Sequence, residues 1–532
     1  MNLGLAITPA APDVNFWILL PELILSVAGV VVMLVDAFTR RESRQRWVTG
    51  ALSLAGLGAA AAATVWLWGD AGTVQPTAQP WGGMIALDPL RLSFTLVFIA
   101  VSALTVLVSM IWVEWEGLPA GEFHTLLLFA TVGMMLMAAG NDLVMLFLGL
   151  EILSIATYVM AGFRRSDVRS NESSLKYFIL GSFSSAFLLF GIALVYGATA
   201  KQIPGGFLAG TTNLSVIAER INDSLYPPLL FAGAAMLLIG FGFKVALAPF
   251  HVWTPDVYEG APTPVTAFMA AGPKAAGFAA FMRTFLFAFP LVAAGASSGA
   301  ATGAQLHSAW LDALWLLAIL TMSVGNVVAL VQTNVKRMLA YSSIAHAGYA
   351  LVGFVAAGAA ADTTRRDDAA AAVVFYLLVY AVMNLGAFAV VTLIARSGDR
   401  RTDVEDYRGI GFQSPALSLS LSLFLLSLIG IPLTAGFMGK VLVFSEALSQ
   451  GYKWLVIIGV LNSAVSVYYY LRLIVVMFFR ERTTQWQSPR IPASVALALV
   501  LTVGGVLYLG LFPGSVIDAF RAAQWNVVSS LR

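Results

Sequence analysis

The chain has 532 residues, of which 59% are hydrophobic and only 11% are charged, and its mean hydropathy is +0.84. This composition excludes a soluble multi-domain protein, and the net charge of +2 indicates no nucleic-acid partner because the basic residues lie in short loops. Without cysteine, the chain has no disulfide, no thiolate-bound cluster and no cysteine nucleophile. No two of its four histidines share a predicted helix and no glycine-rich nucleotide loop is present, so we expect no cofactor or metal bound by this chain.

Apolar segments of about twenty residues, each long enough to cross a hydrocarbon core of roughly 30 Å, recur from end to end. We therefore predict an all-α polytopic membrane protein in a lipid bilayer, with about 14 transmembrane helices. The segments lie near 17–37, 48–68, 90–112, 123–139, 143–163, 175–199, 228–248, 264–285, 308–331, 338–357, 370–395, 416–447, 454–479 and 491–513. No lysine or arginine precedes the first segment, so a cleaved signal peptide is not indicated.

The charges of the loops indicate an orientation. If the N-terminus faces outward, sixteen lysines and arginines fall in the inward loops and nine fall on the outward side. Basic residues are enriched in the cytoplasmic loops of membrane proteins. The sequence therefore predicts a multi-pass protein with both termini on the outer side.

The fifth segment contains a buried acid. Glu151 lies eight residues into it, at a depth of about 12 Å, and no charged residue accompanies it on its own helix. A cation from another helix would decide whether this carboxyl is charged, and Lys244 in the seventh segment is the natural candidate. Lys176, near the inner end of the sixth segment, either reaches the headgroups by snorkelling or takes part in function.

Residues 240–278 combine apolar helix with ionisable groups. The stretch opens with Lys244, is broken by Pro249, continues as a half-polar piece that begins at His251, and ends in an apolar run that holds Lys274. A lysine at the centre of a bilayer costs roughly 2.5–3.5 kcal/mol on insertion scales. Lys274 has about ten residues of apolar helix on either side, too many for snorkelling. A functional role is therefore favoured over a merely tolerated charge.

The twelfth segment is interrupted in a similar way. Gly430, Pro432 and Gly436 are expected to unwind it beside Lys440. Backbone groups freed at membrane depth require protein or water around them. Five spans separate this segment from the seventh, so the two units that contain them lie inverted. Inverted repeats with interrupted helices point to an ion site near the bilayer midplane.

We therefore predict two inverted five-helix repeats with interrupted helices 7 and 12. The predicted divisions are an N-terminal three-helix segment at 1–122, a first repeat at 123–285, a second repeat at 308–480, and a C-terminal helix and tail at 491–532. The repeats are not equivalent, because Ser342 stands where the first repeat has Glu151. His346, close by, is either a proton relay or a hydrogen-bonded packing group.

Several motifs carry a resemblance to a known family. The stretch FKVALAPFHVWTPDVYEGAPTPV resembles the signature of the antiporter-like membrane subunits of NADH-quinone oxidoreductase (respiratory complex I). PEL at the start of the first span, NESSLKYFILGSFSSA in the sixth and PLTAGFMGK in the twelfth are similar to its subunit N branch, whose mitochondrial counterpart is subunit 2. The resemblance covers roughly residues 17–513.

The resemblance implies a proton-translocating subunit of the bacterial inner membrane, with periplasmic termini and with protons and water as its cargo and medium. Its partners would be the other membrane-arm subunits, whereas NADH, FMN, iron–sulfur clusters and quinone would be bound in other subunits of the complex. Electron transfer from NADH to quinone there would drive the pumping. The relay residues would be Glu151, Lys244, Lys274 and Lys440, with His346, Lys176 and His251 as further candidates.

Two other classes of function stay open from the sequence. One is a subunit of a multi-subunit cation/proton antiporter, which shares the outline of the longest motif. The other is a non-conducting structural subunit, in which the polar groups only pack. The PEL start, the sixth-segment motif and the PLTAGFMGK break favour the respiratory subunit.

Overall fold

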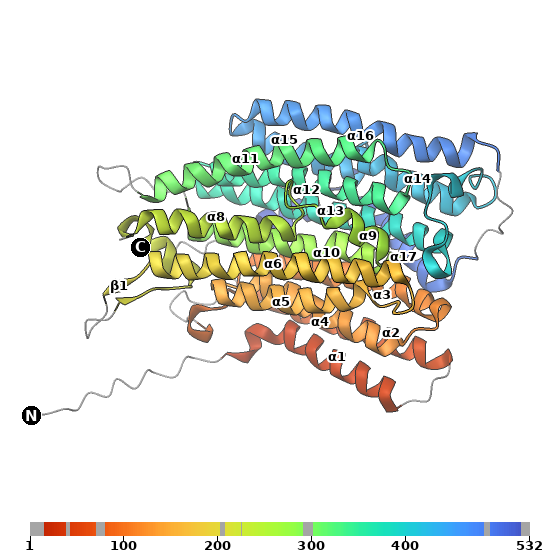
Figure 1. Cartoon of the computed structure of the whole chain (residues 1–532), viewed down its shortest axis with the longest axis horizontal. Coiled ribbons are helices and arrows are strands. Elements are labelled where there is room, and N and C mark those ends of the chain that lie inside the picture. The colour runs from red at the N-terminus through yellow and green to blue at the C-terminus, as the bar shows by residue number, and fades with distance from the viewer. Residues whose placement is uncertain are drawn as a thin grey trace, which may run out of the picture.

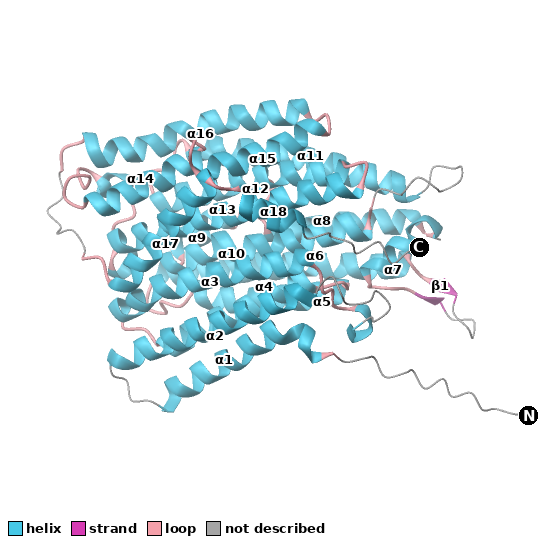
Figure 2. Cartoon of the chain, turned by 180° about the vertical axis from the view of Figure 1, so that it is seen from behind, coloured by secondary structure: helices cyan, strands magenta, loops and turns pink. Residues whose placement is uncertain are grey.

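The structure is a computed structural model that describes residues 15–38, 43–70, 80–202, 208–224, 226–290, 302–482 and 490–522. The two termini, which the loop charges predict to face outward, lie outside these ranges. The described part of the chain is a bundle of long helices that run side by side, with the earliest helices along one edge (Figure 1). Seen from behind, nearly all of it is helical, and one short hairpin projects from one end (Figure 2).

Eighteen α-helices lie in the described residues: α1 Leu20–Phe38, α2 Ser43–Asp70, α3 Pro89–Glu116, α4 Ala120–Ala139, α5 Leu143–Ala161, α6 Val168–Ala198, α7 Leu214–Arg220, α8 Pro227–Lys244, α9 Thr254–Gly260, α10 Thr263–Met282, α11 Thr302–Ala329, α12 Val335–Ala359, α13 Thr363–Ala395, α14 Pro415–Ile429, α15 Ala435–Ser449, α16 Lys453–Phe479, α17 Ala493–Leu511 and α18 Gly514–Ala522. The hairpin consists of antiparallel strands β1 Lys201–Gln202 and β2 Leu208–Ala209.

The number of spans agrees with the sequence. Thirteen of the described helices are long and apolar enough to cross a membrane, and α14 is a shorter apolar helix that continues as α15 after a break at 430–434. Counting α14 and α15 as one crossing gives the fourteen predicted spans. The prediction of an all-helical polytopic fold is confirmed. The interrupted seventh and twelfth spans correspond to α8 and to α14 with α15.

Both interruptions have local causes. α8 ends at Lys244, after which Ala246 adopts a left-handed backbone (φ 61°) and Pro249 lacks an amide hydrogen. α14 ends at Gly430, whose φ of 91° suits a residue without a Cβ atom. Gly436, predicted to belong to the break, instead lies in the first turn of α15, packed closely against the oxygen of Ser427.

Three helices form the centre of the bundle. Every residue of α10 is buried, and α12 and α13 are buried over most of their length. α10 packs against α3, α4, α5, α8, α12 and α13. Ionisable groups on α10 and α12 are therefore surrounded by protein on all sides.

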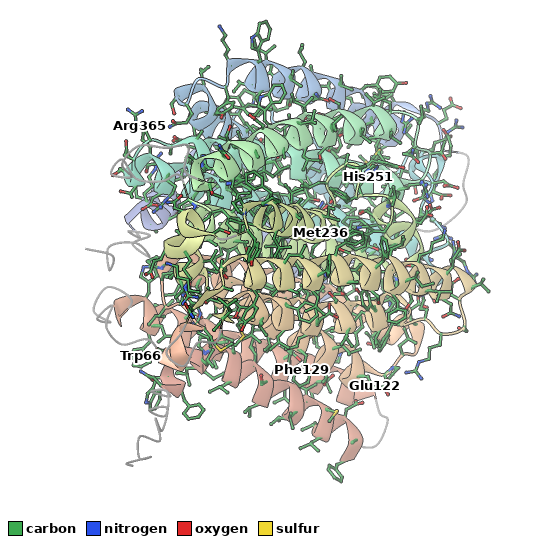
Figure 3. The ribbon with its side chains drawn as sticks, turned by 60° about the vertical axis from the view of Figure 1, so that its left-hand side comes forward. Trp66, Glu122, Phe129, Met236, His251 and Arg365 are labelled. Atoms are coloured by element: carbon green, nitrogen blue, oxygen red, sulfur yellow. The ribbon has the colours of Figure 1, made fainter. Side chains whose placement is uncertain are left out.

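Charged side chains gather at the two ends of the bundle; Glu122 lies at one end and Arg365 at the other (Figure 3). α10 and α12 both begin at the end where Glu122 lies. We call it the basic end, because Arg164, Arg169 and Lys336 lie there. An ionisable residue well along α10 or α12 is consequently deep in the apolar part of the bundle.

Candidate functional site

Glu151 lies between α5 and α6. Its Oε1 atom accepts a hydrogen bond of 2.5 Å from the hydroxyl of Ser185. The carboxylate is half-buried, and its neighbours Leu148 and Ile155 on α5 are exposed apolar side chains. No cation of the described residues lies within ion-pair distance of it, so the direct pairing with Lys244 expected from the sequence is not present.

Lys244, the last residue of α8, turns its ammonium toward α5 and α6. The Nζ atom donates to the Ser154 hydroxyl at 2.9 Å and to the Tyr177 hydroxyl at 3.4 Å. Ser154 lies three residues after Glu151, on the same side of α5. A cavity of about 10 Å³, lined by Ser154, Ser185 and Lys244 among others, has room for about one water molecule. One water could therefore connect the lysine to the serine that binds Glu151.

Lys274 joins the two predicted repeats. It is 2% exposed, and its Nζ atom donates to the backbone oxygen of Ser343 on α12 at 2.7 Å and to the hydroxyl of the same serine. The preceding residue, Pro273, removes one backbone hydrogen bond from α10. Gly277, one turn later, faces Lys244: a Cβ atom there would lie 3.4 Å from Lys244 Cγ. α10 thus carries Lys274 itself and also packs against Lys244.

His346 lies one turn after Ser343 and is 3% exposed. Its Nδ1 atom is 2.7 Å from the Tyr376 hydroxyl, and its Nε2 atom is 3.4 Å from the Tyr470 hydroxyl, which also bonds Ser342. An imidazole between two hydroxyls can accept a proton on one nitrogen and release one from the other. The same contacts would also satisfy a packing histidine.

Lys440 fills the second break. Its Nζ atom donates to the backbone oxygens of Leu428 and Ile429, at 3.1 and 2.7 Å, and to the hydroxyl of Ser463 at 2.8 Å. It also lies 4.8 Å from the centre of the Tyr349 ring, and the Tyr349 and His346 rings are 5.6 Å apart. Lys274, His346 and Lys440 therefore belong to one contiguous set of polar and aromatic contacts.

The other two predicted residues lie apart from this set. Lys176 is at the basic end, where it pairs with Glu172 and Asp256, each at 2.8 Å, and its side chain is 41% exposed. His251 is half-buried in the first break, and its Nδ1 atom has no hydrogen-bond partner in the described part of the chain. Neither is hydrogen-bonded to the lysines inside the bundle.

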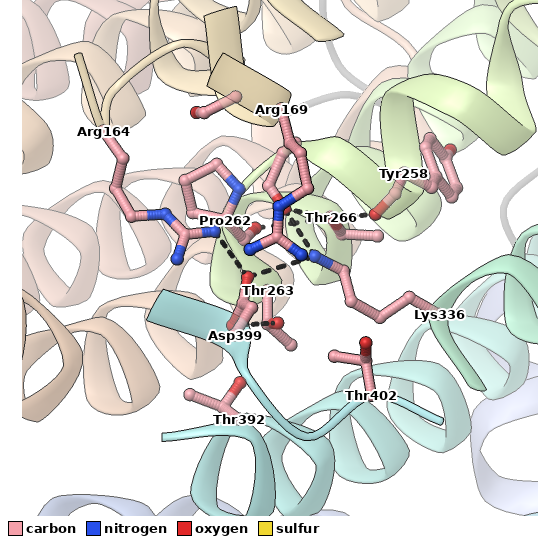
Figure 4. Close-up of polar contacts among 12 residues, drawn as sticks. Arg164, Arg169, Tyr258, Pro262, Thr263, Thr266, Lys336, Thr392, Asp399 and Thr402 are labelled. Atoms are coloured by element: carbon pink, nitrogen blue, oxygen red, sulfur yellow. Dashed lines mark hydrogen bonds and ion pairs between the residues drawn. The ribbon is translucent and has the colours of Figure 1, made fainter. Parts of the chain in front are cut away.

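Sequence reasoning missed a buried carboxylate at the basic end. Asp399, in the loop after α13, accepts hydrogen bonds from Arg164 (2.8 Å), Lys336 (3.1 Å) and Thr263 (2.7 Å), as Figure 4 shows. Burial alone would raise the pKa of this carboxyl, but the charges of Lys336 and Arg164 and the hydrogen bonds outweigh it and hold the pKa below its ordinary value. The signal available in the sequence was the Ser-Gly-Asp turn directly after a long apolar helix.

Two further buried ion pairs lie at the opposite end. Glu22 pairs with Arg91 at 2.8 Å, and Asp88 pairs with Arg283 at 2.7 Å. Glu22 lies in the first turn of α1 and is buried inside the bundle, where its ion pair joins α1 to α3. These pairs hold helices together and are not hydrogen-bonded to Lys244, Lys274 or Lys440.

No group of three or more His, Cys, Asp or Glu side chains that could hold an ion occurs among the described residues. The lysines, the carboxylate, the histidine and the hydroxyls that are present are groups that can exchange protons.

A multi-pass bundle with two interrupted spans, each with a buried lysine beside its break, defines an antiporter-like membrane subunit. A family model described as "NADH:quinone oxidoreductase/Mrp antiporter, TM" matches residues 140–466. The chain is 46% identical over 512 residues to NADH-quinone oxidoreductase subunit N of Trichlorobacter lovleyi, covering 96% of this chain and 97% of that protein. It is 42% identical over 511 residues to NADH-quinone oxidoreductase subunit N 1 of Solibacter usitatus, with 96% and 97% covered.

A solved structure agrees. A chain of respiratory complex I from Thermus thermophilus with bound aureothin is 35% identical and superposes with a TM-score of 0.74, covering 94% of this chain and 100% of that one. The chain therefore belongs to the family of NADH-quinone oxidoreductase subunit N, an antiporter-like subunit of the membrane arm of complex I. The family predicted from the sequence motifs is confirmed.

Proposed function

We propose that this chain translocates protons as part of NADH-quinone oxidoreductase, using Glu151, Lys244, Lys274 and Lys440 as its relay. Electrons pass from NADH to quinone in other subunits, where FMN, iron–sulfur clusters and quinone are bound. The other membrane-arm subunits are its partners in the bilayer. The four residues divide into two sets, Glu151 with Lys244 and Lys274 with Lys440, and α10 carries Lys274 and packs against Lys244 through Gly277.

The contact between Lys274 and Ser343 carries this proposal. It is the place where a buried lysine of the first unit donates to a hydroxyl of the second. A lysine that only filled space there would have cost roughly 2.5–3.5 kcal/mol to insert. A proton released by Lys274 meets the Ser343 hydroxyl first, and His346 follows on the same side of α12 one turn later.

The arrangement of Glu151 and Lys244 supports uptake and release of a proton by Lys244. Glu151 and Lys244 are separated by serines and a one-water cavity rather than locked in an ion pair. A small movement of α5 against α8 would bring the carboxylate nearer or take it away, and each approach favours the charged lysine. A change of one unit in pKa corresponds to about 1.4 kcal/mol, and moving one charge through 100 mV requires about 2.3 kcal/mol. Changes of a few units are therefore sufficient.

The proposal also gives the orientation of the chain in the membrane and its structural units. The chain lies in the bacterial inner membrane with the basic end toward the cytoplasm and both termini toward the periplasm, in keeping with the excess of basic residues in the inward loops. The divisions at 1–122, 123–285, 308–480 and 491–532 are the corresponding structural units. His346 is proposed as the relay between Lys274 and Lys440; Lys176 and His251 are proposed at the approach from the basic end.

The test is proton pumping by intact membranes that contain the whole complex with Lys244→Ala or Lys274→Ala. We expect normal amounts of complex and a loss of protons pumped per NADH oxidised. Lys453→Ala, which removes an exposed lysine at the start of α16, is the matched control and should leave pumping unchanged. Normal pumping by both buried-lysine variants would reject the relay and leave a structural subunit. A sodium-dependent growth defect without respiratory loss would instead identify a cation/proton antiporter.

A further inference from the structure

Asp399 ties together the starts of the two central helices that meet at the Lys274–Ser343 contact. Thr263, the first residue of α10, donates to one carboxylate oxygen at 2.7 Å, and Lys336, the second residue of α12, donates to the other at 3.1 Å. Asp399 is 4% exposed and Lys336 is fully buried. Lys336 also donates to the oxygen of Ala261, just before α10, so the two helix starts are fixed to each other twice.

On each of α10 and α12, the residue that binds Asp399 and the residue that takes part in the Lys274–Ser343 contact lie on the same helix face. Lys274 follows Thr263 by eleven residues and Ser343 follows Lys336 by seven; both spacings return to within about 20° of the same helix face. The corresponding rises are about 16.5 Å on α10 and about 10.5 Å on α12. Long side chains on helices point back toward the N-terminus. An extended lysine side chain therefore covers the difference of about 6 Å.

The loop that carries Asp399 is itself held rigidly. Arg396 and Asp399 have φ values of 57° and 46°, which residues other than glycine adopt only where surrounding contacts maintain them. The Gly398 amide donates to Glu116 at the end of α3, at 2.7 Å, and the Gly398 oxygen accepts from Arg169 of α6, at 3.1 Å. Asp399 is consequently a fixed point to which α10 and α12 are attached.

We propose that Asp399 is a positioning residue of the proton path: by fixing the start of α10 against the start of α12, it sets the register in which Lys274 reaches Ser343. The inference rests on the proposed function, because the contact that it positions is the relay contact. Asp399 itself is about two turns of α12 and three turns of α10 away from that contact and does not exchange the proton.

The test is a double-mutant cycle in the intact complex, with Asp399→Asn, Ser343→Ala and the two combined. Asparagine suits the left-handed backbone at this position and can still accept from Thr263. Each single change is expected to lower protons pumped per NADH by roughly tenfold or less. If Asp399 acts through the contact, the double variant loses much less than the product of the single losses. Losses that multiply would overturn the proposal, because they are the mark of two independent effects.

A control and a second variant separate positioning from assembly. Glu22→Gln removes a carboxylate that is as buried as Asp399 and is also paired with an arginine, but that lies on α1 at the opposite end of the bundle from Asp399. It is expected to lower the amount of complex without changing protons pumped per NADH. If Asp399→Asn fails to assemble, Thr263→Val replaces it in the double-mutant cycle. This variant removes only the hydrogen bond from α10 to Asp399.

The outcome also distinguishes this inference from the proposed function. If Lys274→Ala abolishes pumping while the cycle is multiplicative, the relay stands and the positioning role fails. If Lys274→Ala pumps normally, the relay fails and the positioning role fails with it. Non-additive losses together with a Lys274→Ala defect support both.

Discussion

The ammonium nitrogen of Lys440 lies 2.7 Å from the backbone oxygen of Ile429, the last residue of α14. The last carbonyls of a helix have no amide donor within the helix and carry partial negative charge. Lys440 comes from the second turn of α15, so one half of the broken span binds the end of the other. Removing the proton of this lysine would therefore weaken the contact that holds the two halves of the broken span together.

The first prediction concerns this link. Lys440→Met keeps the length of the side chain but leaves the oxygens of Leu428 and Ile429 without their donor. Because a hydrogen bond to a charged group contributes roughly 1.5–3 kcal/mol, pumping should fall by about tenfold or more. Ser463→Ala, which removes only one of the lysine's acceptors, should cost less. Proton uptake by inverted membrane vesicles measures both, and an equal effect of the two changes would contradict the assignment.

A second prediction compares two glycines with the same backbone strain. Gly430→Ala puts an alanine at φ 91°, with its Cβ atom 3.2 Å from Lys440 Cδ. Gly451→Ala puts an alanine at φ 85°, with no atom within 4 Å of its Cβ. Left-handed backbone costs a non-glycine residue roughly 1–2 kcal/mol, so both variants should lose similar thermal stability. Only Gly430→Ala should also lower protons pumped per NADH. A pumping defect of equal size in Gly451→Ala would show that strain, and not the lysine, is responsible.

A third prediction concerns Lys244 without altering its charge. A Cβ atom on Gly277 would lie 2.7 Å from Val245 Cγ1 and 3.4 Å from Lys244 Cγ, so Gly277→Ala must displace the end of α8. Overpacking of this kind costs roughly 1–3 kcal/mol. We expect assembly to continue and pumping to fall several-fold. Gly58→Ala in α2, where nothing lies within 4 Å, is the matched control, and equal pumping by the two variants would be the contrary result.

The sequence was sufficient for the fold because its strongest signals are local. Twenty-residue apolar runs, the prolines near the two breaks and the lysines beside them are each legible without knowledge of distant residues. The same reasoning also singled out Lys244, Lys274 and Lys440, because a buried cation has a cost wherever its partner lies.

The contacts of those residues could not be predicted in the same way. Glu151 and Lys244 were expected to pair, but the structure places Ser185 and Ser154 between them, and no periodicity reports which helix faces meet. In the sequence, Arg164 is only one of several basic residues in a short loop. It is instead buried against Asp399, 235 positions later in the chain. Pairings of such long separation become visible only when the helices are placed side by side.

A fourth prediction concerns stability alone. Glu22→Gln leaves Arg91 buried without its carboxylate partner, although the arginine keeps its bond to the oxygen of Ile18 at 2.7 Å. Removing one member of a buried ion pair typically costs about 3–5 kcal/mol. The melting temperature of the purified protein in detergent should fall clearly, whereas Glu122→Gln, at an exposed pair with Arg165, should leave it unchanged. Equal melting temperatures would mean that the α1–α3 pair contributes nothing.

The last prediction is a pH dependence with opposite signs for two aspartates of the same loop region. The folded-state pKa of Asp399 is held below its ordinary value of 3.8, so its contribution to stability is complete above that value and is lost as the pH falls through the folded-state pKa. Burial raises the pKa of Asp406, and the nearby Asp403 charge adds to this; the Asp403 amide and Arg401 oppose it. Its contribution is therefore present at low pH and is lost as the pH rises through the raised pKa.

Thermal unfolding of the purified protein between about pH 6 and pH 3 tests both signs, since aspartates titrate near 3.9. Asp399→Asn should flatten the loss of stability on acidification, because the variant has no charge left to neutralise. Asp406→Asn should steepen it, because the variant removes a group whose protonation favours the folded state. The same change of slope in both variants would contradict the assigned environments. A steeper loss in Asp399→Asn would mean that this carboxyl is already neutral in the folded protein and that Lys336 and Arg164 do not hold it as an anion.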